Sequence, residues 1–589
     1  MARLFEDMTV VQLEALLRAR PAASPCPELF LDAAARRRVR RLARENGIWA
    51  DLDANLDPAR PIPVLKRSVY REYRRCGDRK SSDRAWGRRA AELGRASLAV
   101  WLEHPQANLD YLQDLMWAFC DNWTWVGTAH EDHCDVDLVS TGIAVELAEI
   151  VHVLGERLDQ EVRERVHADI ERRIFARFDD PKHWWRRCEM NWNHVCNGNI
   201  MRLALLTVDD PARRAALVHR LVLDMQLALD GFTADGGCTE GPSYWSYGFG
   251  HFVKAAYALH AWTGGAVNLM TADSKIGRIC RYPLAAWIEG DRRATFADAD
   301  HGWVPVEITL RINRMYPLPE LYALCQAHPG GRLLLRNQAE LALYRHEHSR
   351  PVTAADALLP DLGLARIRSR PGARRMTVMA LAGNNGVPHN HNDIGSFIVY
   401  RAGRALLTDP GAPSYAAKTF SPQRYEILFC NSLGHSVPLI NGSQQPPGAN
   451  YLGTIAAEGL NGTGDKTVRI DMSRAYPPGT VKALTRTLKL DFRRHTLEMA
   501  DEYKFARQPR EVVETFVTYE AVRVAADRRS VQIGPVKSGA LLTADQPGRF
   551  AVVHEVAASR EGRSGKVLER ILFRPRALAR DMLLRFRLN

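Results

Sequence analysis

The chain has 589 residues, of which 46% are hydrophobic and 25% charged; this is ordinary globular composition, in a chain too long for one hydrophobic core. We therefore expect two or three domains. The net charge of +12 favours anionic partners, and the arginines that dominate it are spread along the chain. The sequence has no zinc-finger spacing, aromatic RNA-binding motif or basic-region helix, so we expect an acidic polymer as the partner, and not nucleic acid.

The ten cysteines form no CxxC pair, a pattern typical of free thiols in a reducing compartment. No uninterrupted apolar stretch approaches the ~20 residues that span a bilayer, so we expect no membrane partner. The charged start of the chain lacks the apolar region of a signal peptide. The sequence predicts a cytoplasmic protein, or a periplasmic or secreted one if the chain was trimmed, and it predicts no oligomeric state.

The predicted elements divide the chain into three parts, of which the first two are helical. Residues 1–85 read as short helices with proline-rich breaks such as Pro61-Ile62-Pro63. Residues 86–355 have a helical period, with runs at 87–103, 108–120, 138–153, 157–177, 193–207, 211–230, 246–262 and 276–289. Many of these helices are apolar on more than one stripe, and no fixed-period repeat is present. Such helices form bundles, solenoids or α/α toroids.

Residues 356–589 change to the period of two that is typical of strands, with runs such as 375–382, 396–401, 467–473, 479–490, 495–505, 511–523 and 581–588. Turn signals such as Asn441-Gly442 and Asn461-Gly462 separate them. These runs predict an antiparallel β-sandwich. The expected fold class is therefore α+β multidomain, with an α-rich domain followed by the β-sandwich.

The first polar motif is Glu189-Met190-Asn191-Trp192-Asn193-His194-Val195-Cys196-Asn197-Gly198-Asn199, at a predicted helix start. Asn191 and His194 lie three residues apart and share a helix face. Asparagines at helix starts are often only caps, but the polar residues around Trp192 exceed what capping needs, so we favour a functional role. Weaker clusters of the same kind contain Trp125 and His130, for which a helix-end polar patch is the alternative.

The second motif is Asp235-Gly236-Gly237-Cys238-Thr239-Glu240-Gly241-Pro242-Ser243-Tyr244-Trp245-Ser246-Tyr247-Gly248. Pro242 fits a first helical turn, and Glu240, Tyr244 and Tyr247 then fall on one helix face. Tyrosines in helices usually fill cores. Two tyrosines and a tryptophan after a glycine-rich loop instead indicate a lined groove, and tryptophan faces suit sugar rings.

The third motif, Pro388-His389-Asn390-His391-Asn392-Asp393, packs two histidines and an aspartate between a Gly-Pro break and an apolar run. Neutral imidazoles bind metals and shuttle protons. Asp409 closes a later apolar run, and His435 follows in another turn. If successive β segments bring them together, His391, Asp409 and His435 make a site for a divalent metal; a polar turn with surface histidines is the alternative.

Together the motifs resemble the heparinase II/III type of polysaccharide lyase in order and spacing. The matching segments are the first motif from 191 to 198, the second from 240 to 248, the third from 389 to 397, Asp409-Pro410-Gly411 and His435-Ser436, over roughly residues 100–450. The resemblance implies an incomplete (α/α) toroid followed by a β-sandwich, with the substrate cleft between them.

The resemblance also implies catalytic roles. Asn191, Asn193 or His194 would bind the uronate carboxylate. Tyr244 would be the acid/base, with Tyr247 as its competitor, and His389 would be a second base.

The same resemblance implies a metal and a substrate groove. His391, Asp409 and His435 would hold a divalent metal, commonly zinc, which pins the loops of the β domain. The substrate-binding candidates are Trp192, Glu240, Tyr247, Arg424, Trp125 and His130.

β-Elimination gives these residue types a physical reason. Removing the C5 proton of a uronate adds charge to an existing carboxylate, so donors aimed at that carboxylate stabilise the transition state. A tyrosinate base at neutral pH needs a lowered pKa, which a nearby arginine or protonated histidine can supply. Arg424 is the candidate for that role, or for binding a substrate carboxylate.

The function we expect is a lyase acting on an acidic polysaccharide or oligosaccharide, a uronate-containing glycan of glycosaminoglycan or alginate type. An (α/α)-toroid glycoside hydrolase is one alternative, with Glu240 and Asp235 as its paired carboxylates, but it leaves the metal-type histidines without a task. A non-catalytic acidic-glycan-binding protein is the other. The sequence does not choose among heparan sulfate, chondroitin, hyaluronan and alginate.

Overall fold

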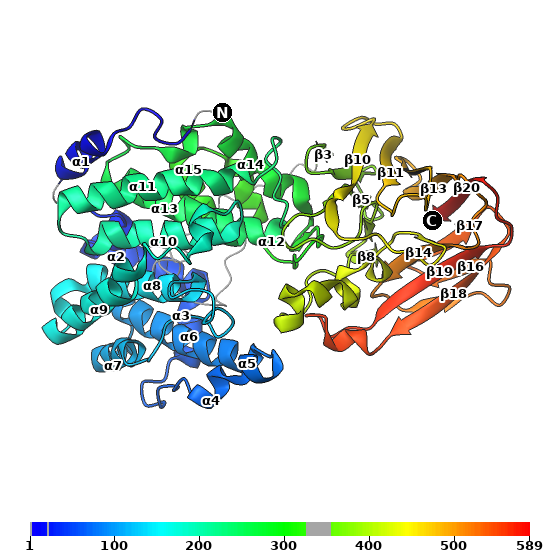
Figure 1. The fold of residues 1–589 in the computed structure, drawn as a ribbon. Coiled ribbons are helices and arrows are strands. Elements are labelled where there is room, and N and C mark those ends of the chain that lie inside the picture. The colour runs from blue at the N-terminus through cyan, green and yellow to red at the C-terminus, as the bar shows by residue number, and fades with distance from the viewer. Residues whose placement is uncertain (1–2, 21–22, 326–354) are drawn as a thin grey trace. The chain divides into compact units, whose positions relative to one another are not determined.

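The computed structural model describes residues 3–20, 23–325 and 355–589, so the part of the expected helical domain at 326–354 lies outside the described residues. The chain divides into two compact units (Figure 1). The helical unit comprises Met1–Gly231, Ser246–Gly277 and Val304–Pro351, and the β unit comprises Phe232–Trp245, Arg278–Trp303 and Val352–Asn589. Two short segments from the helical half of the sequence thus belong to the β unit. The expected fold class, α+β multidomain with helices first and antiparallel sheets second, is confirmed.

The helical unit begins with α1 (Val10–Arg18), α2 (Ala33–Glu45), α3 (Ile48–Asn55), α4 (Arg67–Tyr70) and α5 (Glu72–Cys76). Longer helices follow as α6 (Lys80–Leu102), α7 (Leu109–Cys120), α8 (Leu138–Leu154), α9 (Gln160–Arg173), α10 (Asn191–Thr207) and α11 (Pro211–Asp230). After a segment of the β unit come α13 (Gly250–Trp262), α14 (Ser274–Ala286) and α15 (Val306–Met315); from Arg278 on, α14 belongs to the β unit.

Helix α10 is the centre of the helical unit, because it packs against α8, α11 and α13 and is buried along most of its length. Close packing requires a small residue at Gly198, where a Cβ would lie 3.0 Å from the carbonyl oxygen of His251 in α13. The N-terminal residues join the same unit. The backbone N–H of Leu4 donates to the side chain of Gln226 at 3.0 Å, next to where α1 packs against α11.

The segment Leu138–Arg157, which contains α8, meets the length and hydropathy requirements for a membrane span. It is, however, 67% buried inside the helical unit, as a core helix is, and it carries Glu146 and Glu149. The Arg202 guanidinium of α10 pairs with Glu149, so the buried charge of Glu149 is neutralised where the two helices pack together.

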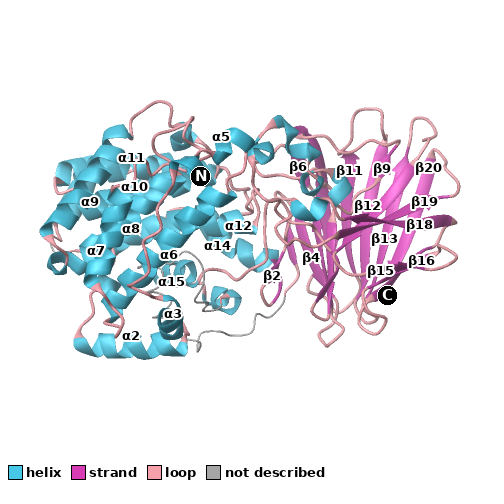
Figure 2. Cartoon of the chain, turned by 90° about the horizontal axis from the view of Figure 1, so that it is seen from below, coloured by secondary structure: helices cyan, strands magenta, loops and turns pink. Residues whose placement is uncertain are grey.

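The β unit holds three larger antiparallel sheets (Figure 2). The five-stranded sheet has the order β3 (Ala357–Leu359), β4 (Leu364–Arg368), β5 (Met376–Leu381), β7 (Phe397–Arg401), β8 (Arg404–Leu407). The nine-stranded sheet has the order β15 (Val522–Val524), β16 (Ser530–Ile533), β17 (Ala540–Ala544), β20 (Asp581–Leu588), β13 (Thr496–Lys504), β12 (Ala483–Asp491), β11 (Lys466–Arg474), β10 (Gly448–Glu458), β6 (Gly383–Asn385). The four-stranded sheet has the order β18 (Gly548–Glu555), β19 (Leu568–Pro575), β14 (Val512–Thr518), β9 (Leu439–Ile440), and a small hairpin pairs β1 (Trp287–Glu289) with β2 (Arg292–Arg293).

The sheets share one hydrophobic core. Val378 from the five-stranded sheet, Leu488 from the nine-stranded sheet and Phe516 from the four-stranded sheet belong to a single buried cluster. Along β20, buried and exposed residues alternate, as the period of two predicted. The predicted run 511–523 is instead two strands, β14 and β15, because the residues between them turn and carry the chain into a different sheet.

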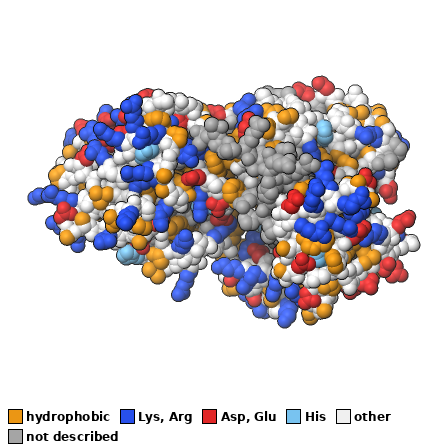
Figure 3. Space-filling model, turned by 180° about the vertical axis from the view of Figure 1, so that it is seen from behind, with side chains coloured by type: hydrophobic (Ala, Val, Ile, Leu, Met, Phe, Trp, Pro, Cys, Tyr) orange, Lys and Arg blue, Asp and Glu red, His pale blue; other side chains and the backbone are white. Residues whose placement is uncertain are grey.

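All ten cysteines lie in described residues and are free thiols, eight of them buried, which confirms the prediction of free thiols. Lys and Arg side chains are spread over the face in Figure 3 and are interspersed with acidic ones. Many of the basic side chains are therefore balanced locally, as in the pairs Arg213–Glu171 and Arg469–Glu458.

Candidate active site and metal centre

The candidate active site lies on loops of the β unit. Asp298 follows the β1–β2 hairpin, His389 lies between β6 and β7, and Tyr415 follows β8. His389 and Ala297, the neighbour of Asp298, both have φ of 59°, a left-handed conformation that non-glycine residues rarely adopt. Strained backbone of this kind is held only where surrounding contacts impose it, and it gathers at functional sites.

Asp298 is the centre of the site, because both of its carboxylate oxygens accept hydrogen bonds. Oδ2 accepts from Nδ1 of His389 at 2.9 Å and from the Tyr415 hydroxyl at 3.0 Å. Oδ1 accepts from Nε2 of His391 at 3.0 Å and from the Arg424 guanidinium at 2.8 Å. Burial raises the pKa of Asp298, but these hydrogen bonds and the Arg424 charge outweigh it and hold the pKa well below the ordinary range. Asp298 is therefore an ionised acceptor.

Because Asp298 is ionised, it fixes the tautomer of His389. Nδ1 must carry the proton that Asp298 accepts, so Nε2 carries the lone pair when the ring is neutral. A carboxylate oxygen of Glu240 lies 3.5 Å from that Nε2. The arrangement of Asp298, His389 and Glu240 suits a general base whose protonated form is stabilised by nearby carboxylates.

Tyr244 stacks on His389, with ring centroids 4.1 Å apart and an interplanar angle of 21°. Its hydroxyl lies 2.6 Å from the Tyr415 hydroxyl. Since Tyr415 donates to Asp298, the oxygen of Tyr415 accepts the proton of Tyr244. The resting site thus contains a protonated Tyr244 beside a histidine base.

The expected lowering of the Tyr244 pKa is wrong. Burial raises the pKa of Tyr244 well above its ordinary value, and the Asp298 and Glu240 charges raise it further, while the Arg563 charge opposes them. Arg424 does not serve this role: it is buried and donates to Asp298 and to the carbonyl oxygens of Asn390 and Thr419. The same contacts argue against its predicted role as a substrate-binding residue.

The predicted common helix face of Glu240, Tyr244 and Tyr247 is also wrong. Glu240 lies in a turn, α12 is only Pro242–Tyr244, and a π-helix spans Trp245–Phe249 before α13 begins. A π-helix turns by i→i+5 hydrogen bonds, so the spacing of 3 and 4 no longer places side chains on one face. Tyr244 belongs to the β unit, whereas Tyr247 is 40% exposed and belongs to the helical unit.

Of the three residues of the first motif predicted to bind the carboxylate, two are packing residues. The side-chain amide of Asn193 donates to the carbonyl oxygens of Arg186 and Asp224, both at 2.9 Å. His194 is buried beside Phe252, with Nε2 3.1 Å from the carbonyl oxygen of Met225, and burial lowers its pKa to about 3. These contacts contradict the predicted role of Asn193 and His194 in binding a carboxylate. The buried His194 imidazole is neutral, and both side-chain N–H groups of Asn193 already donate to backbone carbonyl oxygens.

Asn191, the third residue of this motif predicted to bind the carboxylate, is the first residue of α10 and remains a candidate for that role. Trp192 is half-buried and lies against Trp184 and His130, at centroid distances of 5.1 and 4.7 Å. Trp184 is 45% exposed, so this aromatic group reaches solvent.

Trp125, by contrast, is a core residue. It is 1% exposed and donates its indole N–H to the carbonyl oxygen of Phe119 at 2.7 Å, with the Arg173 guanidinium 4.8 Å from its ring. The predicted sugar contact of Trp125 is therefore wrong.

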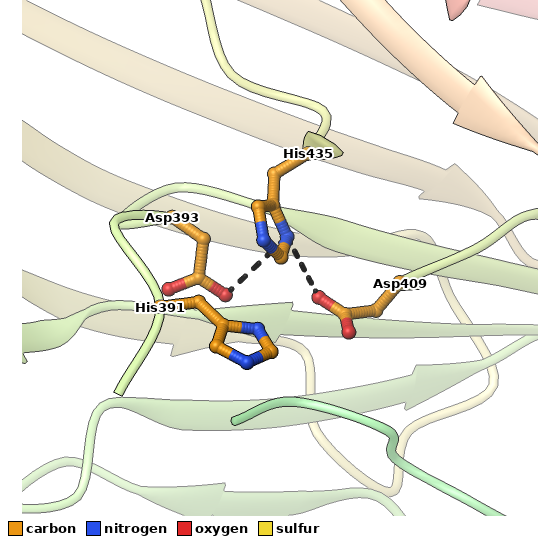
Figure 4. Close-up of side chains that lie close together, drawn as sticks. All are labelled: His391, Asp393, Asp409 and His435. Carbon is orange, nitrogen blue, oxygen red and sulfur yellow. Dashed lines mark hydrogen bonds and ion pairs between the residues drawn. The ribbon is translucent and has the colours of Figure 1, made fainter. Parts of the chain in front are cut away.

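Four buried side chains gather in one cluster, as Figure 4 shows: His391, Asp393, Asp409 and His435. His391 links this cluster to Asp298. One ligand atom of each lies within 4.8 Å of the others. Nδ1 of His435 is 3.0 Å from Asp409 and 3.7 Å from Asp393. The three predicted ligands are brought together, and Asp393 joins them.

The donor set fits a divalent metal. Nε2 of each histidine is held from behind, by Asp298 for His391 and by the carbonyl oxygen of Phe429 for His435, so that each Nδ1 faces the cluster. This is the outer-shell pattern of metal-binding histidines. Within the described part of the chain, Nδ1 of His391 and Oδ2 of Asp393 are buried and have no hydrogen-bond partner, as expected of atoms that bind an ion. Two carboxylates and two neutral imidazoles would balance a charge of +2.

The electrostatics of the cluster agree with this fit. Burial raises the pKa of Asp393, and the carboxylates of Asp409 and Asp393 raise the pKa of His435 against the effect of its burial. The negative charge of Asp409 contributes to the raised pKa of both groups. A bound cation would compensate that charge.

A cavity of about 90 Å³ lies within the β unit beside both sites. Gly241 and Pro242 of the second motif line it, together with Asn390, His391 and Asp393 of the third. The two motifs that the sequence placed about 150 residues apart thus meet around one small cavity.

Sequence reasoning missed Asp298, Tyr415 and Arg563 and did not count Asp393 as a ligand. A signal for Asp298 existed, because Asp298-Ala299-Asp300-His301 is an acidic cluster with a histidine directly after a strand pair. Tyr415 gave no comparable signal, since a single tyrosine after Asp409-Pro410-Gly411 is unremarkable.

Residues 351–564 match the sequence model of the family described as heparinase II/III-like, C-terminal. No curated protein matches the chain. Solved structures with a similar fold include a heparinase III, with a TM-score of 0.59 and 12% identity over 96% of this chain and 92% of that chain.

A second is a heparinase III, the BT4657 gene product with methylated lysines, with a TM-score of 0.58 and 12% identity over 98% of this chain and 88% of that chain. A third is a mutant of the heparan sulfate lyase HepC from Pedobacter heparinus, with a TM-score of 0.58 and 10% identity over 98% of this chain and 87% of that chain. At these identities the structural similarity establishes the fold. Residues 351–564 are thus similar to the heparinase II/III-like C-terminal domain, and the fold of the chain is similar to that of heparinase III, as the sequence motifs predicted.

Proposed function

We propose that the chain is a polysaccharide lyase that cleaves a uronate-containing acidic glycan by β-elimination. The observation that carries the proposal is the stacked Tyr244–His389 pair, joined on one side to the buried carboxylate of Asp298. β-Elimination needs a base for the C5 proton and an acid for the departing 4-O oxygen. The pair offers one group of each kind.

In the proposed reaction His389 is the base. Its Nε2 takes the C5 proton, the C4–O4 bond breaks and a C4=C5 double bond forms. Asp298 at 2.9 Å and Glu240 at 3.5 Å stabilise the imidazolium that results. Tyr244, kept protonated by its raised pKa, gives its proton to the departing oxygen.

The helical unit would supply the remaining functions. Asn191 is the proposed donor to the uronate carboxylate, where a hydrogen bond would stabilise the charge that develops in the transition state. Trp192 and Trp184, with His130, form the proposed sugar platform, since Trp184 is exposed and aromatic faces suit sugar rings.

The proposed substrate class is a glycosaminoglycan first and an alginate-type polymer second, because the structures of similar fold are a heparinase III and a heparan sulfate lyase. A glycoside hydrolase is less well supported. Asp235, one of its two expected carboxylates, is occupied by the backbone N–H groups of Gly237, Asp361 and Leu362.

Incubation with heparan sulfate, chondroitin, hyaluronan and alginate tests the reaction type. A lyase is expected to produce ultraviolet absorbance from the C4=C5 double bond on at least one of these glycans. New reducing ends without that absorbance would assign the chain to the hydrolases, and intact glycan after long incubation would make it a binding protein.

We further propose that His391, Asp393, Asp409 and His435 hold one divalent metal, with zinc favoured by the mixed histidine and carboxylate set. The ion would neutralise the two carboxylates and pin three loops of the β unit. This chain's residues take no chemical step through it.

His435→Ala is expected to reduce metal content from stoichiometric to substoichiometric and to lower the melting temperature, because the free energy of metal binding adds to that of folding. Elemental analysis and thermal melting measure the two effects. His389→Ala is the matched control, because it removes a histidine from the same loop as His391 that is not a proposed metal ligand. Equal metal content in both variants would contradict the site.

A further inference from the structure

A basic pocket on the helical unit shares no residue with the candidate active site or the metal cluster. It has a volume of about 420 Å³, within the range of ~300–1,000 Å³ that is typical of ligand sites. All of its lining residues lie between residues 64 and 88, so the pocket belongs to the helical unit alone. The lining includes three cationic, one polar and two apolar side chains: Lys66, Arg84, Arg88, Ser81, Val64 and Ala85.

The first half of helix α6 forms one wall of the pocket. It contributes four lining residues at the spacing i, i+3, i+4 and i+7, which share one helix face: Ser81, Arg84, Ala85 and Arg88. Arg84 and Arg88 are both exposed and lie about 6 Å apart along the helix axis. Lys66 lines the pocket from the residue before α4, which packs against α6 (Figure 1). Two separate elements thus bring three positive charges to one pocket.

The positive charges of the pocket are not balanced locally. No Asp or Glu is among the lining residues. Within the described residues, Lys66, Arg84 and Arg88 take part in no ion pair, whereas the neighbouring Arg67 pairs with Glu131 at 3.3 Å. Three cations around a concave surface, without a carboxylate among them, create a positive potential that attracts anions.

The lining also offers apolar surface. Val64 is 72% exposed, and Val69 and Ala85 are half-buried. A small inorganic anion would use only the charges of such a pocket. A sugar ring with anionic substituents would use both parts, because its C–H groups are apolar and its substituents are charged.

Contacts within the helical unit link the pocket to the proposed sugar platform. Arg67 directly follows Lys66, and its guanidinium pairs with Glu131. Glu131 is next in the chain to His130, whose ring lies 4.7 Å from that of Trp192 in the platform. A polymer that lies on the platform can therefore extend over these residues to the pocket, which favours a glycan chain as the occupant.

We propose that this pocket is a further binding subsite, which holds a sulfated sugar of the glycan through Lys66, Arg84 and Arg88. The proposal rests on the lyase function proposed above and narrows its substrate class to a sulfated glycosaminoglycan. A guanidinium can hold two oxygens of one anionic group, and the ammonium adds a point charge. Sulfated sugars can carry more than one negative charge on a ring, whereas alginate carries one carboxylate per sugar, so three cations in one pocket favour sulfate.

Dextran sulfate is the probe for this site, because it carries sulfate but no uronate and cannot undergo β-elimination. Isothermal titration calorimetry with the full chain measures its affinity. The triple variant Lys66→Gln, Arg84→Gln, Arg88→Gln is expected to bind it about 10-fold to 100-fold more weakly, since three charged contacts with sulfate are lost. The difference should shrink at high salt, because salt screens exposed charges. All three positions are exposed, so the variant should fold as the wild type does.

The triple variant Arg37→Gln, Arg38→Gln, Arg41→Gln is the matched control. It removes the same three charges from exposed positions of α2. Helix α2 contacts the other end of α6, where Arg40 donates to the carbonyl oxygen of Leu102 at 2.6 Å. The control should keep the affinity for dextran sulfate within about 2-fold of the wild type. Alginate, which has carboxylates and no sulfate, should lose less affinity than dextran sulfate in the pocket variant.

Equal losses of dextran sulfate affinity in the two triple variants would overturn the proposal, because net charge alone would then account for binding. Unchanged affinity in the pocket variant would also overturn it, as would an equal loss for alginate. These results leave the lyase function standing, since dextran sulfate is not a substrate for β-elimination. A wild type that gives no ultraviolet product on the glycan panel would instead overturn the lyase function, and with it the substrate class assigned from this pocket.

Discussion

Tyr244→Phe is expected to lower the turnover of the lyase by ~10²–10⁴-fold, the usual contribution of a general acid or base. The change keeps the ring that stacks on His389 and removes only the hydroxyl, so the melting temperature should stay close to that of the wild type. Ultraviolet product formation at saturating glycan measures the turnover.

Tyr247→Phe is the control for this prediction, since it removes a tyrosine hydroxyl from the same motif at an exposed position. It should cost much less, as loss of a sugar contact would. His389→Ala should be as severe as Tyr244→Phe for the rate, while retaining the metal. An inactive Tyr247→Phe beside a normal Tyr244→Phe would move the acid to Tyr247. Full activity of both variants would exclude these two tyrosines from proton transfer.

Asp298→Asn is expected to have the largest combined effect, on turnover and on stability. The carboxylate holds the tautomer of His389 and balances the buried Arg424. Removing one partner of a buried ion pair typically costs ~3–5 kcal/mol of the free energy of unfolding, because the other charge stays buried without compensation. Turnover should fall by ~10²–10⁴-fold, since the base then loses its orientation. Denaturant unfolding and product formation measure the two losses.

The stability loss has a defined pH dependence. The pKa of Asp298 is lowered in the folded state from its ordinary value of 3.8, so its stabilising effect is fully present above that value and is lost as the pH falls through the folded pKa. Wild type and Asp298→Asn should therefore differ most above about pH 4 and converge in stronger acid. Asp300→Asn, which removes a carboxylate from an exposed pair with Arg563, should cost ~1 kcal/mol or less. Equal losses in the two variants would contradict the central place of Asp298.

Local patterns in the sequence were sufficient to predict the elements and the order of the motifs. The helical period gave runs such as 211–230, which is α11, and the period of two gave 581–588, which is β20. These predictions hold because amphipathic periodicity is a property of neighbouring residues. The three metal-type residues His391, Asp409 and His435 were predicted together from their residue types at turns. In the structure they lie on loops next to strands of three different sheets, after β6, after β8 and before β9.

Local patterns failed where a long-range contact overrides them. The common helix face of Tyr244 and Tyr247 was wrong because a π-helix interrupts the spacing, and no residue in that stretch marks a π turn. His194, Asn193 and Trp125 look functional in the sequence, yet they turn inward and satisfy backbone carbonyl groups. Whether a polar side chain faces the core or a groove depends on which helices pack around it.

By itself, the sequence determined the two kinds of domain, the heparinase II/III-like motifs and most of the chemistry-bearing residue types, because these follow from composition and spacing. Only the tertiary structure decided which of them act together. Asp298 comes from a hairpin segment about 90 residues before His389, and Tyr415 from a loop after β8, so no sequence spacing relates them. The folding of the segment 278–303 into the β unit brings the carboxylate to both histidines and to Arg424. Their hydrogen bonds and the Arg424 charge outweigh its burial and give it the lowered pKa on which the proposed site depends.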